Sequence, residues 1–243
     1  MRYRIDLAYN GENYHGWQTQ PNAPTVQETL ERAFSLILRQ NTSITGCGRT
    51  DTGVHAEYYV AHFDSYDING KKLGDLVHKM NSFLPKDIAI YNIEPVDDSF
   101  NARFSAVSRS YRYLIHTRKD PFLDRSSWLV PYPIDIEKMN QGCEILKRYT
   151  DFASFCKAGS DTKTTICHIS SAQWTQNGHR IVFEITADRF LRNMVRAIVG
   201  TMVDIGLGKT SLAEFEGIIK SHKRSSAGQS VPAKGLALVE VVY

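Results

Sequence analysis

Residues 46–56 concentrate side chains that can do chemistry, because glycines, an arginine, an aspartate and a histidine follow one another closely. Arg49 lies two residues before Asp51, so both side chains point the same way if the segment is extended. A neighbouring cation favours an ionised carboxylate, which can act as a nucleophile or a base. The segment therefore predicts a reactive loop between two strands. A plain turn, in which Asp51 bonds to its own backbone, is the alternative.

Several common kinds of site are excluded by the same residues. The segment has neither the G-x-x-x-x-G-K-[ST] pattern of a phosphate loop nor the G-x-G-x-x-G pattern of a dinucleotide fold. His55 and His62 are a weak signal for a metal, and no two of the four cysteines have C-x-x-C spacing. We expect no metal and no cofactor, and we expect His55 to brace the loop through hydrogen bonds.

Basic residues are unevenly distributed along a chain whose formal net charge is only +3. Residues 103–125 hold six basic side chains against two acidic ones, and residues 185–235 hold eight against four. A basic face on a nearly neutral protein suits a polyanion, although solvated surface charge is the alternative. No apolar stretch is long enough to span a bilayer, and the N-terminus has no apolar signal core. We expect a cytoplasmic protein.

Hydrophobic periodicity predicts the elements that must position these residues. Alternation over 2–9 predicts a strand, and a capping box at Thr25–Glu28 opens a helix over 26–39. We expect further strands over 43–45, 58–63, 88–93, 110–117, 164–174, 180–187 and 235–242, and further helices over 72–83, 136–146, 191–205 and from 212.

Each half of the chain mixes hairpin-linked strands with helices, and Asn177-Gly178 is a strong hairpin signal. This arrangement favours an α+β class with mostly antiparallel sheets. We place the domain junction within 95–108, which gives an N-terminal domain over 1–105 and a C-terminal domain over 106–243.

Nine consecutive residues, 48–56, match the G-R-T-D-x-G-V-H-A signature of the TruA-type tRNA pseudouridine synthases. The chain resembles this family at further motifs in the family's order, and only 126–175 match loosely. These motifs lie at 9–20 (Y-N-G-E-N-Y-H-G-W-Q-T-Q), 102–106 (A-R-F-S-A), 111–113 (Y-R-Y), 190–196 (F-L-R-N-M-V-R) and 232–238 (P-A-K-G-L-A-L).

The resemblance implies roles for individual residues. It puts the nucleophile at Asp51, an active-site tyrosine at Tyr111 and a basic partner at Arg196, while Arg49 would hold a flipped nucleotide open. We expect Arg196 to turn inward from the 191–205 helix, and Arg192, one turn earlier, to reach a phosphate. Other residues implied in RNA binding are Arg103, Arg109 and Arg112, and those implied in loop support are Thr50, Gly53 and His55.

The resemblance also implies a reaction and a partner. The expected activity converts uridine to pseudouridine at positions 38, 39 and 40 of the tRNA anticodon arm, without a cofactor, in a homodimer. The target uridine must be flipped out of its stack, and the two basic segments would hold phosphates on either side of a cleft between two subdomains. A single carboxylate suits isomerisation, whereas a glycoside hydrolase uses two. A hydrolase and a non-catalytic RNA-binding protein are the alternatives.

Overall fold

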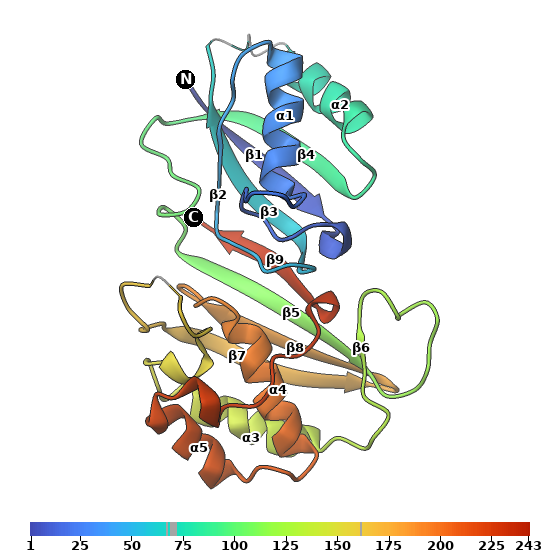
Figure 1. Ribbon diagram of the computed structural model, residues 1–243, viewed down its shortest axis with the longest axis vertical. Helices are drawn as coiled ribbons and strands as arrows, with labels where there is room; N and C mark the ends of the chain where they lie inside the picture. The colour runs from blue at the N-terminus through green and yellow to red at the C-terminus, as the bar shows by residue number, and fades with distance from the viewer. Residues whose placement is uncertain (67, 69–71, 161) are drawn as a thin grey trace. The chain divides into compact units, whose positions relative to one another are not determined.

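The computed structural model describes residues 1–66, 68, 72–160 and 162–243 (Figure 1). In these ranges, nine strands and five α-helices form a mixed structure in which most strand pairs are antiparallel. The predicted α+β class is therefore confirmed. The chain forms two compact units, one of Met1–Val107 with Leu238–Tyr243 and the other of Ser108–Ala237. None of the helices formed by the described residues is long and apolar enough to cross a membrane.

The first unit is a sheet with two helices on one face (Figure 1). Its elements are β1 (Arg2–Tyr9), α1 (Val26–Leu38), β2 (Ile44–Gly46), β3 (His55–Asp64), α2 (Leu73–Phe83), β4 (Ile88–Val96) and the end of β9 (Leu236–Val242). Strand β1 lies between β3 and β4, and both β2 and β9 are neighbours of β3. The chain therefore returns to this unit at its C-terminal strand.

Strand β1 shows why the sequence folds this way locally. Its side chains alternate between buried and partly exposed, so Tyr3 and Tyr9 fall on the buried face. Tyr3 stacks on Phe63 of β3 with ring centroids 5.4 Å apart. The Thr25 side chain accepts a hydrogen bond from the Glu28 amide and caps α1 as predicted. These contacts fix β1 and α1, which lie before and after residues 10–25 in the chain.

The second unit places a sheet against three helices (Figure 1). Its elements are β5 (Ser108–His116), β6 (Trp128–Leu129), α3 (Ile136–Leu146), β7 (Ile169–Asn177), β8 (Arg180–Ala187), α4 (Met194–Gly206) and α5 (Leu212–Ser221). Strand β8 lies between β5 and β7, and β6 pairs with β5 in parallel. Trp174 of β7 stacks on Phe183 of β8 at 4.5 Å, and its indole Nε1 faces the Met202 sulfur of α4 at 3.2 Å.

Three predicted boundaries are wrong for identifiable reasons. Strand β3 begins at His55 rather than 58, because its pairing with β1 extends to Ala56, directly after the loop that precedes the strand. Strand β4 continues through Pro95, which an edge strand tolerates because the missing amide costs no ladder bond. Residues 164–168 do not join β7, because this segment bonds to 150–152 instead, and Ile166 bridges to Asp151.

Candidate active site

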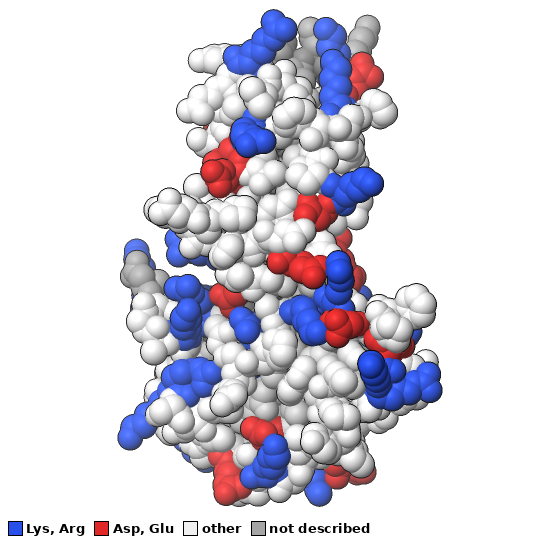
Figure 2. Space-filling view, turned by 45° about the vertical axis from the view of Figure 1, so that its right-hand side comes forward, with Lys and Arg blue, Asp and Glu red and all other residues white. Residues whose placement is uncertain are grey.

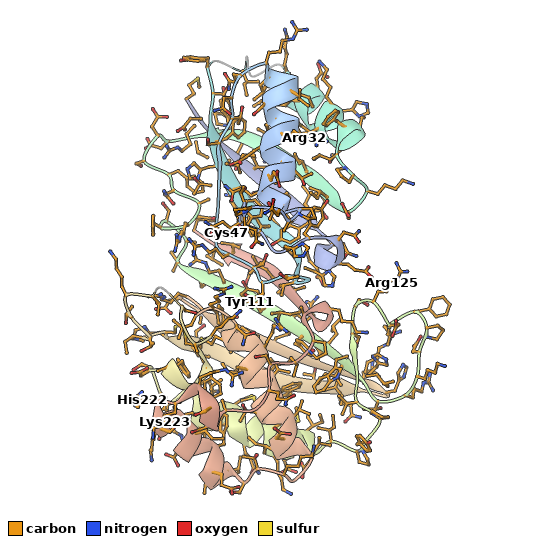
Figure 3. All side chains as sticks on the ribbon, in the orientation of Figure 1. Arg32, Cys47, Tyr111, Arg125, His222 and Lys223 are labelled. Atoms are coloured by element: carbon orange, nitrogen blue, oxygen red, sulfur yellow. The ribbon has the colours of Figure 1, made fainter. Side chains whose placement is uncertain are left out.

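The loop that carries Asp51 connects β2 to β3 and begins at the buried Cys47 (Figure 3). Within it, Arg49 is exposed, Thr50 is buried and Asp51 is partly exposed. The Val54 amide donates to the Asp51 carbonyl at 3.1 Å, which closes a tight turn. The Asp51 carboxylate is thus attached to a tight turn, in which the side chains that precede it point in different directions.

An aromatic cluster from three elements lies beneath this loop. Trp17 stacks on Tyr59 of β3 with ring centroids 4.1 Å apart, and Tyr9 of β1 lies 5.5 Å from the Tyr59 ring. The Tyr59 hydroxyl donates to the Gly48 carbonyl, and the Tyr9 hydroxyl bonds to Thr50 Oγ1 at 2.8 Å. Both residues that flank Arg49 are therefore bonded to the cluster. Such buried hydrogen bonds hold a functional residue rigid more effectively than a free loop can.

The segment 10–17 crosses the Asp51 loop at van der Waals distance. The Trp17 amide donates to the Thr50 carbonyl at 3.3 Å, and the Gly53 amide donates to the Tyr14 carbonyl at 3.2 Å. A Cβ placed on Gly16 would stand 2.3 Å from the Thr50 carbonyl oxygen, and φ of Gly16 is +87°. Only glycine fits this crossing without strain.

His55 connects the same two segments. Its Nδ1 accepts a hydrogen bond from the Gly11 amide at 3.0 Å, so the proton of the neutral ring lies on Nε2. A Cβ on Gly11 would stand 2.0 Å from the Val54 carbonyl oxygen. The side chain of His55 and the absence of one at position 11 together set the distance between the two segments.

Tyr111 lies on β5 in the second unit and is partly exposed (Figure 3). Its ring meets Phe190 edge to face, with centroids 5.1 Å apart and planes at 88°. Phe190 belongs to the segment between β8 and α4, so this contact fixes the tyrosine ring against the entry to the helix. Edge-to-face geometry is a favourable arrangement for two aromatic rings, so Phe190 stabilises this orientation of Tyr111.

Arg196 lies on the first turns of α4 and is partly exposed. Its Nε donates to the Val231 carbonyl at 2.7 Å, and the Val231 amide donates back to the Arg196 carbonyl at 3.3 Å. The Tyr113 hydroxyl donates to the Pro232 carbonyl at 2.8 Å. Burial raises the pKa of Tyr113, so this hydroxyl stays protonated and remains a donor. The segment 231–232 thus fixes the stem of the arginine side chain.

The predicted placement of Arg192 on the same helix as Arg196 is wrong. Helix α4 begins at Met194, because Asn193 has φ of +65° and ends any right-handed turn before it. Arg192 is exposed in the turn that precedes the helix, and its carbonyl accepts the Lys157 amide at 3.0 Å. The two arginines therefore do not share one helical face.

Three other arginines that are predicted to bind RNA make contacts within the protein. Arg109 donates to the Asp188 carbonyl at 2.9 Å, and Arg112 forms a cross-strand ion pair with Glu184 at 3.1 Å. Arg103 is exposed, and its guanidinium lies 5.3 Å from the ring centre of Phe104. Each of these side chains is thus partly oriented by a protein group.

The structure brings together some of the predicted site residues and divides others. Arg49, Thr50, Asp51, Gly53 and His55 lie in one loop or at its end in the first unit. The second unit holds Arg109, Tyr111, Arg112, Arg192 and Arg196, whereas Arg103 lies in the first unit, outside that loop. A meeting of both sets in one cleft belongs to the proposal below.

Two features of the part of the chain that the structure describes bear on metal binding and on thiol chemistry. No group of three or more His, Cys, Asp or Glu side chains lies close enough there to hold a metal ion. Burial raises the pKa of the Cys143 and Cys167 thiols to about 12, so both stay protonated.

Sequence reasoning missed the residues that support the site, namely Trp17, Tyr59 and Phe190. Trp17 and Phe190 lie inside the motifs at 9–20 and 190–196, so the sequence marked both positions. It did not show which residues they would contact. Tyr59 stands in an ordinary strand pattern, and only the fold shows that its hydroxyl reaches the Gly48 carbonyl.

Three proteins that match 98–100% of this chain have the same description. Proteins described as tRNA pseudouridine synthase A from Parabacteroides distasonis and Porphyromonas gingivalis are each 49% identical over 245 residues, which cover 100% of this chain and 96% and 97% of theirs. One of the same description from Thermoanaerobacter pseudethanolicus is 41% identical, covering 98% of each chain.

A solved structure of a CRISPR endoribonuclease bound to RNA aligns with 85% of this chain and 97% of its own at 11% identity, but its TM-score of 0.19 supports no argument. The family described as tRNA pseudouridine synthase matches residues 7–105 and 149–243. Together with the identities above, this match shows that the chain belongs to the tRNA pseudouridine synthase family.

Proposed function

We propose that this chain converts uridine to pseudouridine in the anticodon arm of tRNA, at positions 38, 39 and 40, with Asp51 as the nucleophile. The observation that carries the proposal is that contacts with the aromatic cluster and with segment 10–17 hold the Asp51 loop in a fixed position. Its neighbour Thr50 bonds to Tyr9 from within the aromatic cluster, and segment 10–17 crosses it closely. Catalytic groups need this kind of fixed position.

The reaction breaks the N1–C1′ glycosidic bond, turns the base and forms a C5–C1′ bond. The proton on C5 leaves and N1 gains one, so the reaction is an isomerisation without net redox change. Asp51 bonds covalently to one of the two fragments, the pocket retains the other, and the bond to Asp51 breaks again so that the carboxylate is regenerated in the product complex. Tyr111 stacks on the base and takes part in the proton transfer. The single carboxylate of the loop fits this chemistry better than hydrolysis.

Arg196 supplies the positive charge beside Asp51 in this proposal. An ionised carboxylate in a dry site needs such a partner, because desolvation alone would protonate it. The hydrogen bond from Arg196 Nε to the Val231 carbonyl supports the assignment, since it fixes the stem of the side chain and so restricts where the guanidinium can point. Arg49 keeps the flipped nucleotide in place.

The domains 1–105 and 106–243 flank a basic cleft in this account, and a homodimer acts in the cytoplasm. Arg103, Arg109, Arg112 and Arg192 contact phosphates, while Thr50, Gly53 and His55 support the loop. Binding should then weaken as salt rises, because each phosphate contact releases a counterion.

A conversion assay on defined tRNA tests the proposal. The protein is incubated with unmodified tRNA in the presence of a chelator, and pseudouridine is mapped by carbodiimide adducts. We expect new signals at the anticodon-arm uridines, and none when those uridines are replaced by cytidine. Binding without conversion would favour the non-catalytic RNA-binding protein. Conversion elsewhere in the tRNA would overturn the assignment to the anticodon arm, and a monomer by light scattering would overturn the homodimer.

A further inference from the structure

The loop between β5 and β6, residues 117–127, carries an aromatic ring that has no place in the core. Phe122 is 91% exposed, more than any other large apolar side chain among the described residues. A phenylalanine left in water forgoes the stabilisation that burial brings, so at this loop tip the ring is available to stack on a partner.

The backbone around the ring is held by local hydrogen bonds. The Phe122 amide donates to Asp120 Oδ1 at 3.0 Å, and the Leu123 amide donates to the Asp120 carbonyl at 3.2 Å. The Ser126 amide then donates to the Leu123 carbonyl at 3.2 Å. Two successive turns therefore hold Phe122 at a fixed position. The first is stabilised by the Asp120 side chain, which accepts a backbone amide two residues later, as aspartate commonly does in turns.

The base of the loop is attached to the sheet. His116 Nδ1 and Ser127 Oγ, both buried, form a hydrogen bond of 2.9 Å across the two ends of the loop. The Thr117 amide donates to the His179 carbonyl at 2.9 Å, and β6 pairs with β5. A partner that binds Phe122 would therefore meet a loop that is already ordered, which lowers the entropy cost of binding.

Exposed cations surround the ring along the chain. Arg118, Lys119 and Arg125 are all exposed, and the Arg125 side chain projects away from the loop backbone (Figure 3). In the space-filling view, basic side chains lie beside uncharged atoms on the projecting right-hand part of the surface (Figure 2). An aromatic ring among cations is the composition that binds single-stranded nucleic acid.

The two acidic residues of the loop face a histidine and a lysine of neighbouring segments. Asp120 Oδ2 lies 3.4 Å from His179 Nε2, and Asp124 Oδ1 lies 3.5 Å from Lys234 Nζ. The charge of Asp124 is thus partly offset by Lys234, and the three basic side chains of the loop outnumber its two acidic ones, which favours an anion near Phe122.

We propose that the 117–127 loop is a second contact site for tRNA, where an unpaired base stacks on Phe122 and phosphates lie against Arg118 and Lys119. The proposal rests on the proposed function, because it assigns a further part of the same substrate. A second copy of the chain fits less well. One loop tip is small against the roughly 800 Å² per partner of a stable interface, and two copies meeting there would bring like charges together.

The geometry of β5 sets the scale of this contact. Thr117 follows Tyr111 by six residues along the strand direction, which spans about 20 Å at ~3.3 Å per residue. The loop that carries Phe122 therefore begins well away from Tyr111, so we assign the base on Phe122 to a nucleotide other than the one that reacts. The loop should affect how tightly tRNA binds, and not the chemical step.

The experiment compares four variants of the full-length protein with the wild type. Phe122→Ala and Phe122→Leu remove the aromatic face, Phe122→Trp keeps it, and Tyr66→Ala removes an equally exposed ring, 90% exposed, elsewhere. We expect the Kd and KM for tRNA to rise roughly tenfold in Phe122→Ala and Phe122→Leu, at unchanged kcat. Phe122→Trp and Tyr66→Ala should match the wild type.

Salt dependence tests the phosphate contacts separately. Replacing both Arg118 and Lys119 by Gln should reduce the slope of log Kd against log salt by about 0.7–0.9 per lost contact. An unchanged Kd in Phe122→Leu would overturn the stacking contact, and a fall in molecular mass of Phe122→Ala by light scattering would assign the loop to self-association. Failure of the wild type to convert uridine would instead refute the proposed function.

Discussion

Replacing Gly16 with alanine tests the idea that segment 10–17 fixes the Asp51 carboxylate. The new Cβ would stand 2.3 Å from the Thr50 carbonyl oxygen, whereas real Cβ contacts stay above 3.0 Å. The carbonyl, or the segment that crosses it, must therefore move by roughly 0.7 Å. Because Asp51 follows Thr50 directly, this displacement passes into the loop that carries the carboxylate.

The expected loss has a stability part and a catalytic part. Alanine at φ of +87° costs about 1–2 kcal/mol, and a weakened bond from the Trp17 amide to the Thr50 carbonyl adds about 1 kcal/mol. We expect Gly16→Ala to lower the free energy of unfolding by about 2–3 kcal/mol. A misplacement near 1 Å costs on the order of a hundredfold in rate, so kcat should fall by about that factor.

The assay measures single-turnover conversion of tRNA at saturating enzyme, with unfolding in urea measured in parallel. Gly178→Ala is the matched control, because Gly178 also has positive φ, +58°, but has open space around it. It should lose about 1 kcal/mol of stability and keep the wild-type rate. A folded Gly16→Ala protein with the wild-type single-turnover rate would refute the reasoning.

Three further predictions test side chains that support the two units. In a double-mutant cycle, Tyr9→Phe and Thr50→Val should couple by about 1 kcal/mol in urea unfolding, and additive effects would exclude a stabilising 2.8 Å bond. Burial, then the Arg2 charge, lowers the pKa of His62, whose Nδ1 accepts the Ala102 amide at 3.1 Å. The unfolded chain therefore binds the proton more readily, so stability is complete above pH ~6.5 and declines as pH falls below it. The Tm should fall between about pH 7 and pH 5, less steeply in His62→Gln; equal slopes would contradict this. Arg224→Ala removes the donors to three acceptors in residues 227–230, so it should lower the free energy of unfolding by about 1–3 kcal/mol. Arg224→Lys should not restore this loss, because lysine lacks the planar set of donors. Full recovery in Arg224→Lys would show that only the positive charge matters.

Local signals in the sequence predicted elements that need few long-range contacts. Helix α3 and strand β8 lie where periodicity placed them, and the Ser211–Glu214 capping box forms with both of its hydrogen bonds. The Asn177-Gly178 pair closes the β7–β8 hairpin. In each case the determining residues lie within four positions of one another, so the sequence displays them directly.

Boundaries set by distant partners could not be predicted in this way. The start of α4 depends on the left-handed Asn193, whose side chain bonds to Ser230 Oγ. The start of β7 depends on a bridge between Asp151 and Ile166. The seat of the Asp51 loop depends on contacts such as Tyr9 with Thr50, which lie 41 residues apart. The signature at 48–56 indicated where chemistry should occur, but not what holds it in place.

The most direct test of the central claim compares wild-type protein with Asp51→Asn on unmodified tRNA. Asparagine has nearly the same shape as aspartate but cannot act as the nucleophile. The account predicts that Asp51→Asn binds tRNA with the wild-type Kd and forms no pseudouridine in a single-turnover assay. Conversion by Asp51→Asn at the wild-type rate would contradict it.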